Sequence, residues 1–168
     1  MTSNNPSSQQ LVFKLMQILG YAGVIPFAIP VALTGLDFWY GIDVFKGSVV
    51  TFSAVYIFTS YSAIILSFMS GTLWANWRLV ESQKKATLAV LVSNFLALSA
   101  FFSLLLMYAE AVPGLFCVIV LTLGFISLLW VEWFVGAKFN AYWRMRLRLT
   151  ALVVMLHLVM ITFLFMEL

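Results

Sequence analysis

The chain from Ser53 to Trp77 reads SAVYIFTSYSAIILSFMSGTLWANW and is apolar enough to cross a lipid bilayer. Small, hydroxyl-bearing and aromatic residues recur in it at alternating steps of three and four, namely Ser53, Tyr56, Ser60, Ala63, Ser67, Ser70 and Trp74. This spacing is one face of an α-helix. Helices associate in lipid through close backbone approach and hydrogen bonds, which small residues allow. We therefore expect this helix to lie inside a bundle, with most of the other helices touching it.

The composition is that of an integral membrane protein. Of the 168 residues, 64% are hydrophobic and 9% are charged, whereas charged residues make up about a quarter of a soluble domain. A bilayer core is crossed by about 20 helical residues, and five charge-poor segments suit that length: Leu11–Gly35, Val49–Ala75, Thr87–Ala109, Leu115–Val135 and Leu149–Met166. We predict an all-α, polytopic bundle of five transmembrane helices over residues 11–168. The polar residues 1–10 cannot bury apolar surface and are expected to be a disordered cytoplasmic tail.

The positions of the nine Lys and Arg residues predict the orientation. With five spans, all of them except Lys46 fall on the side of the N-terminus: Lys14, Arg78, Lys84, Lys85, Lys138, Arg144, Arg146 and Arg148. Cytoplasmic loops carry the excess of Lys and Arg, so we expect the N-terminus in the cytoplasm and the C-terminus outside it. The basic loops also suit anionic lipid headgroups, although anchoring of the topology alone explains them.

The first span contains an unusual segment with two prolines, GYAGVIPFAIP over residues 20–30. Pro26 and Pro30 have no N–H, so each leaves without a helical partner the carbonyl four residues earlier, on Ala22 and Pro26. In hydrocarbon such carbonyls have to find another partner. One interpretation is a kink repaired by serine hydroxyls; the other is a broken helix that forms a substrate or cation site, as in many secondary transporters.

His157 is an ionisable residue deep in a span. It lies near the centre of the fifth span, about level with the freed carbonyls and with Ser60. Ionisable residues at this depth are costly and often functional. Two interpretations stay open: a neutral imidazole that forms a hydrogen bond across the bundle, or a group that carries a proton or binds a ligand.

Glu132 lies about one turn from the cytoplasmic end of the fourth span, within reach of Arg144, Arg146 or Arg78. An ion pair between Glu132 and Arg144 could tie the loop to the bundle. The alternative is a gate or an ion-entry site at that end of the protein.

The residue types present disfavour several functional classes. The chain has one histidine and one cysteine, Cys117, and no paired carboxylates at bilayer depth. These residues do not suit an intramembrane metalloprotease or a haem protein. We expect no enzyme activity, metal or cofactor, and no nucleic-acid partner.

Three stretches resemble a small family of bacterial inner-membrane proteins with a mitochondrial relative, catalogued as a domain of unknown function. They are residues 20–27 (GYAGVIPF), residues 61–71 (YSAIILSFMSG) with Trp74, and residues 142–146 (YWRMR) leading to Thr150. The resemblance implies a five-span bundle in the bacterial inner membrane, with the C-terminus then in the periplasm. It implies no particular reaction or catalytic residue.

Two functional hypotheses follow. The leading one is a transport-related homo-oligomer with a midplane site for a substrate or ion, formed by Ala22, Pro26, Pro30, Ser60, Ser67 and His157. The alternative is a non-transporting factor for envelope integrity or for assembly of a membrane complex. A transporter requires a hydrated polar cavity that reaches one side, whereas a scaffold fills that space with side chains.

Overall fold

The fold is a bundle of helices. The computed structural model describes residues 6–42, 53–76, 80, 82–110, 112–136 and 141–167. These residues form α1 (Pro6–Ala22), α2 (Ile25–Tyr40), α3 (Ala54–Ala75), α4 (Gln83–Tyr108), α5 (Gly114–Val135) and α6 (Ala141–Met166). They contain no strand, and five stretches are long and apolar enough to cross a membrane. The predicted all-α, five-span architecture is confirmed.

The first crossing is made by two helices, α1 and α2, which together give the apolar stretch Gln10–Tyr40. The helix is interrupted at Gly23 and Val24, just before Pro26. The predicted break of the first helix by proline is therefore present. Helix α1 begins at Pro6, inside the stretch expected to be a tail, while residues 1–5 lie outside the described part of the chain.

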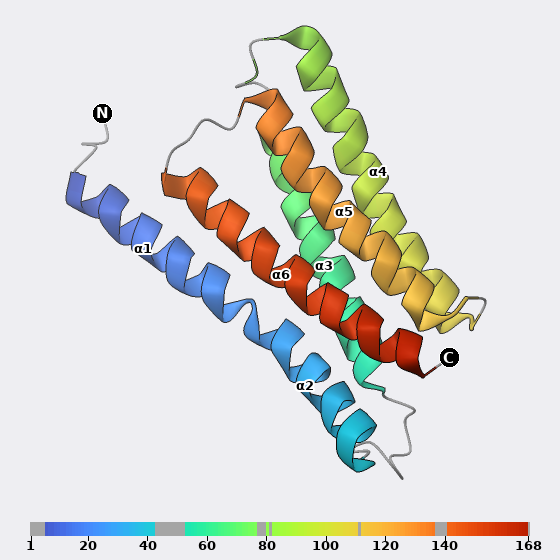
Figure 1. The fold of residues 1–168 in the computed structure, drawn as a ribbon. Helices are drawn as coiled ribbons and strands as arrows, with labels where there is room; N and C mark the ends of the chain where they lie inside the picture. Colours follow the sequence, from blue (N-terminus) through green and yellow to red (C-terminus); the bar gives the residue numbers. More distant parts are fainter. Residues whose placement is uncertain are drawn as a thin grey trace.

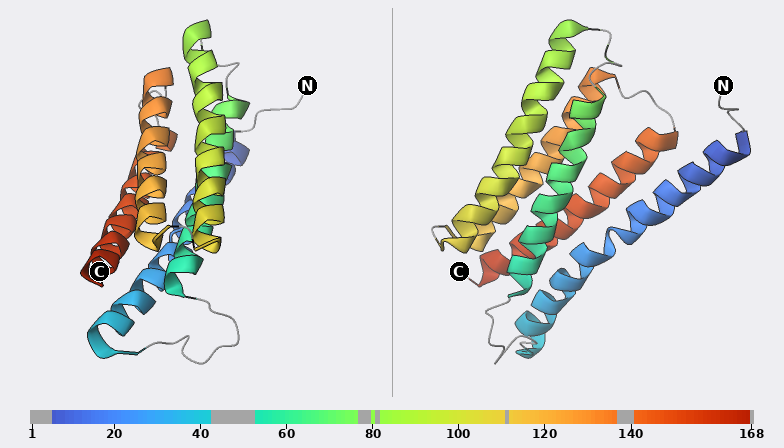
Figure 2. Two further views of the ribbon diagram at one scale, coloured as in Figure 1. Left: turned by 90° about the vertical axis from the view of Figure 1, so that its right-hand side faces the viewer. Right: turned by 180° about the vertical axis from the view of Figure 1, so that it is seen from behind.

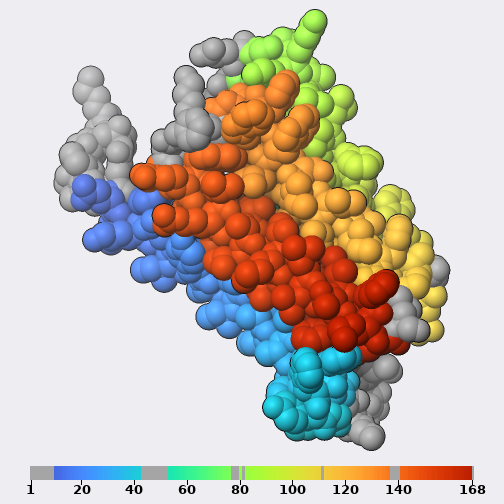
Figure 3. All heavy atoms as spheres, in the orientation of Figure 1, coloured from blue at the N-terminus to red at the C-terminus, as the bar shows by residue number. Residues whose placement is uncertain are grey.

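Helices α1 and α2 run in the same direction, and each later helix runs antiparallel to the one before it (Figures 1 and 2). The α1–α2 crossing and α4 lie at opposite edges of the bundle. Helix α6 lies on the face between α1–α2 and α5 (Figure 3). One end of the bundle carries the first half of α1, the end of α3, the start of α4, the end of α5 and the start of α6 (Figure 1). We call it the basic end, because all the described Lys and Arg residues lie on these segments: Lys14, Lys84, Lys85, Arg144, Arg146 and Arg148. Lys46, Arg78 and Lys138 lie outside the described residues.

Helix α3 is central, as expected, and packs against α2, α4 and α5. Its buried face differs from the predicted stripe, however. Ala63 and Ser70 are buried, but Ser60 and Ser67 are only half-buried and Trp74 is exposed. The buried face also takes bulky and polar residues that the small-residue pattern did not include: Phe58, Thr59, Ser62, Leu66 and Leu73. Shape complementarity with three neighbours, and not small size alone, decides which side of α3 faces inward.

Helices α3 and α4 meet along a seam of small residues. Helix α4 buries its small side chains where it packs against α3 and α5, namely Ala86, Ala89, Ser93, Ala100 and Ser103. The Ser93 hydroxyl donates a hydrogen bond to the carbonyl of Ser70 on α3 at 2.8 Å. Helices α3 and α5 also approach each other closely, since a Cβ added to Gly124 would lie 2.5 Å from Leu66 Cδ2. These close approaches give α3 its central place.

Candidate functional site

His157 lies at mid-depth and is enclosed by aromatic rings. Its ring centroid is 4.6 Å from that of Phe58, 5.3 Å from that of Phe125 and 5.7 Å from that of Phe27. The residue is fully buried. Nδ1 donates a hydrogen bond to the Val153 carbonyl at 2.8 Å, and Nε2 has no hydrogen-bond partner among the described residues. Side chains therefore fill the space around the imidazole.

Hydroxyl groups cover main-chain carbonyls at and just after the helix break. The Tyr61 hydroxyl donates to the Gly23 carbonyl at 3.0 Å, and the Thr34 hydroxyl donates to the Pro30 carbonyl at 3.0 Å. The Gly23 carbonyl is available because the amide of Phe27 bonds to Val24 instead, at 3.1 Å. The sequence pointed to freed carbonyls on Ala22 and Pro26, whereas the carbonyl that Tyr61 covers is that of Gly23.

The six residues predicted for a midplane site occupy different environments. Ala22 is exposed and Pro26, Ser60 and Ser67 are half-buried, whereas Pro30 and His157 are buried. The buried hydroxyls nearest to His157 along α3, on Thr59 and Ser62, donate to carbonyls of their own helix. Neither cavity described below is lined by any of the six. The functional role of these residues stays a prediction.

A buried ion pair joins α5 to α6 near the basic end. Glu132 pairs with Arg146, which is 5% exposed. Arg146 Nε donates to Glu132 Oε2 at 3.2 Å, and Nη2 donates to Oε1. The Thr72 hydroxyl donates to the same Oε1 at 3.4 Å, and Arg146 Nη1 faces the sulfur of Met69. Three helices thus meet at one pair of charges.

Arg146, and not Arg144, is the partner of Glu132. The two arginines are two residues apart on α6, which turns them about 200° from each other around the helix. Arg144 is exposed, whereas Arg146 points into the bundle. The sequence allowed either arginine, and only the rotation of α6 decides between them.

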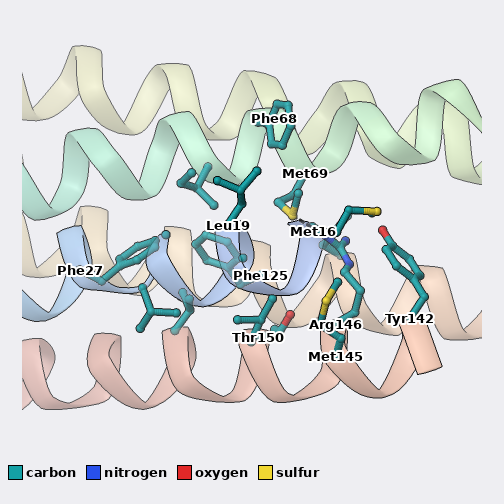
Figure 4. Close-up of a pocket in the computed structure, with 17 residues that line it drawn as sticks. Met16, Leu19, Phe27, Phe68, Met69, Phe125, Tyr142, Met145, Arg146 and Thr150 are labelled. Carbon is teal, nitrogen blue, oxygen red and sulfur yellow. Dashed lines mark hydrogen bonds between the residues drawn. The ribbon is translucent and has the colours of Figure 1, made fainter. Parts of the chain in front are cut away.

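An apolar cavity of about 350 Å³ lies between α1, the start of α2, α3, α5 and α6. Its lining includes Leu19, Phe27, Phe68, Phe125, Arg146 and Thr150. Figure 4 shows Phe27 at one end, and Tyr142, Met145 and Arg146 at the other. Leu19 and Phe68 are also largely exposed on the outer surface. The apolar cavity therefore opens sideways, toward the part of the surface that lipid would cover.

A second cavity, of about 240 Å³, lies at the basic end. We call it the polar cavity because polar side chains form part of its lining. Its lining includes Thr72, Asn76, Glu132, Tyr142 and Trp143. Arg146 lines the apolar cavity and its partner Glu132 lines the polar one, while Tyr142 lines both. The ion pair thus stands where the two cavities meet.

Lys85 holds the start of α4 against the end of α5 beside this site. Its ammonium donates to the Phe134 carbonyl at 2.9 Å and lies 4.8 Å from the centroid of the Phe134 ring. A cation at a helix C-terminus interacts favourably with the helix dipole. The contact fixes one side of the basic end.

Comparisons with known proteins identify the family of the chain. Neither curated proteins nor solved structures give a match. A family model described as "Protein of unknown function (DUF3429)" matches residues 12–162. The three stretches that resemble a family of unknown function lie within this range. Because the match covers nearly the whole chain, the protein belongs to this family.

Proposed function

We propose that this integral membrane protein is transport-related, and that it moves an apolar or amphipathic ligand between the bilayer and the basic end. The ligand enters the apolar cavity from the side, and the ion pair between Arg146 and Glu132 acts as the gate to the polar cavity. The observation that carries this proposal is the position of the pair, with one partner lining each cavity. The protein binds and moves the ligand without changing it chemically.

In this proposal the gate stays closed in the absence of a ligand, because separating the pair would leave two buried charges without partners. Removing one partner of a buried ion pair typically costs about 3–5 kcal/mol, because the other charge is left buried and unpaired. Thr72 adds a further hydrogen bond to the carboxylate. Opening thus requires that ligand or water replace these contacts.

The break between α1 and α2 supplies a hinge beside the cavity. Hinges are short segments between rigid elements that absorb changes in backbone angles. Helix α1 contributes Leu19 to the cavity and approaches α6 closely at Gly20, where an added Cβ would lie 2.8 Å from Leu149 Cδ1. A rotation of α1 at Gly23 would widen the side opening without moving α2.

The setting in the cell is part of the proposal. The bias of Lys and Arg supports a cytoplasmic basic end in a bacterial inner membrane, in contact with anionic headgroups. We also propose a homo-oligomer: α4 lies at the edge of the bundle and turns Phe95, Leu98 and Phe102 outward, a face suited to a second copy. Native mass spectrometry in nanodiscs tests this, and a monomer under all conditions would contradict it.

A flux assay tests transport. Liposomes contain a single-chain lipid that carries a fluorescent group on its chain, and dithionite quenches only the outer leaflet. With the protein present, we expect quenching to proceed beyond the outer leaflet, and Thr150→Phe, which narrows the apolar cavity, to prevent this. The matched control is Leu158→Phe, which adds the same ring at an exposed position of α6. His157→Phe in the same assay tests the midplane prediction. Quenching equal to that of protein-free liposomes would contradict transport.

One observation favours a second candidate, a non-transporting assembly or envelope-integrity factor. Phe27, Phe58 and Phe125 fill the midplane around His157, as expected of a scaffold. The same flux assay separates the two candidates, because a scaffold leaves the quenching unchanged.

A further inference from the structure

We infer that the ligand of the apolar cavity is a single-chain amphiphile with a carboxylate head, of the long-chain fatty acid class, and that Arg146 binds its head. The inference rests on the proposed function, since it names the class of ligand for the same cavity. It is argued from the geometry of the guanidinium, the charge of the basic end and the volume of the cavity.

The guanidinium of Arg146 has an edge that Glu132 does not use. A guanidinium carries five N–H donors and can bind carboxylates in a bidentate manner. Glu132 takes the edge formed by Nε and Nη2. Nη1, on the other edge, faces the thioether sulfur of Met69, which is a weak acceptor. A stronger acceptor in the cavity would therefore bind at Nη1 without displacing Glu132.

The cavity places this edge beside polar groups at one end of an otherwise apolar space. Two residues of its lining carry hydroxyl groups, Tyr142 and Thr150. Both lie nearer to Arg146 than Phe27 does (Figure 4). Phe27 and Phe125 line the cavity away from this end (Figure 4). A ligand that matches both ends has a polar head and an apolar chain.

The charge of the surroundings selects an anionic head. The basic end holds all the described cations, and Arg146 is the charged residue in the lining of the apolar cavity, whereas its partner Glu132 lines the other cavity. Such a surface attracts anions and repels cationic amphiphiles. Arg146 is also nine-tenths or more buried, and in this setting a charge-assisted hydrogen bond is stronger than one in water.

The volume favours one chain over two. About 350 Å³ is at the lower end of the range of about 300–1,000 Å³ for small-molecule pockets. This volume suits one hydrocarbon chain better than the two chains of a phospholipid. A phospholipid, the other membrane source of an anionic head, is thereby disfavoured.

Native mass spectrometry of the full chain in detergent tests the inference with three probes of equal chain length: oleate, oleylamine and monoolein. At alkaline pH, where oleate is ionised, we expect one oleate to bind per chain in preference to the other two. Arg146→Lys keeps the charge and the pairing with Glu132 but lacks the second edge. Because a hydrogen bond to a charged group contributes about 1.5–3 kcal/mol, we expect it to weaken oleate binding at least tenfold. The control is Arg144→Lys, an exposed arginine on the same helix.

A second pair of variants keeps the test decisive if Arg146→Lys does not fold. Thr150→Phe narrows the cavity and should weaken oleate binding at least tenfold, whereas Leu158→Phe should not. Equal binding of oleate and oleylamine, or oleate binding unaffected by both Arg146→Lys and Thr150→Phe, would overturn the inference. The two proposals can fail separately. Flux without a preference for the anionic head would refute only the ligand class, and oleate binding without flux would refute only transport.

Discussion

The hydroxyl of Tyr61 compensates for a main-chain hydrogen bond that is lost in the first crossing. Tyr61 bonds to the carbonyl of Gly23, because the amide of Phe27 bonds to Val24 instead. Some loss in this segment was predictable, because proline has no N–H, but the prolines pointed to the carbonyls of Ala22 and Pro26 and not to that of Gly23. The identity of the Tyr61 partner was not predictable, since it depends on how closely α3 approaches the break in three dimensions.

Tyr61→Phe tests this compensation. The variant removes the hydroxyl and leaves the Gly23 carbonyl with one partner fewer in an apolar setting. We expect it to lower the free energy of unfolding by about 1 kcal/mol, between the average for interhelical hydrogen bonds in membranes and the cost of an unsatisfied buried group. Unfolding in mixed micelles measures the change. The control is Tyr108→Phe, at a largely exposed tyrosine at the end of α4; equal stability of the two variants would refute the role of Tyr61.

The buried ion pair, too, was predictable only in part from the sequence. The sequence placed Glu132 near the end of its span and several arginines within reach, because both positions follow from hydropathy alone. It could not choose Arg146 over Arg144, since the choice depends on the rotation of α6 about its axis. It also gave no sign of either cavity, because a cavity depends on how side chains from several helices fit together.

At the scale of helices, close approach to α3 determines which elements become neighbours. Gly124 on α5 lies against Leu66, which is fully buried. The five spans, their order and the break in the first were predictable from hydropathy and proline positions. The inward face of α3 was predicted only in part, because Phe58 and Leu66 pack in it beside the small residues.

Gly124→Ala tests the α3–α5 contact. The new methyl group would lie 2.5 Å from Leu66 Cδ2, so the leucine has to move within a filled core. Overpacking costs about 1–3 kcal/mol and alanine gains up to about 1 kcal/mol over glycine in a helix, so we expect a net loss of about 1 kcal/mol. Gly71→Ala is the matched control, since a Cβ there meets nothing within 4 Å. Thermal unfolding in detergent compares the two; a melting temperature of Gly124→Ala at or above that of Gly71→Ala would contradict the close contact.

At the scale of the whole molecule, the arrangement of charge predicts the orientation in the membrane. The described cations gather at one end, and the C-terminal end of α6 lies at the other (Figure 1). We expect a reporter enzyme that works only outside the cytoplasm to be active when fused to the C-terminus and inactive when inserted in the α3–α4 connection. The reverse pattern would mean that the basic end faces outward, against the rule for positive charges.

The central claim is that the pair of Arg146 and Glu132 closes the apolar cavity toward the polar one. The most direct measurement is the labelling rate of Thr150→Cys in nanodiscs by a charged, water-soluble thiol reagent. The parent chain is the control, because its one cysteine, Cys117, is fully buried. We predict slow labelling while the pair is intact and labelling at least tenfold faster when Glu132→Gln is added. Equal labelling rates with and without Glu132→Gln would contradict the claim that this ion pair is the barrier.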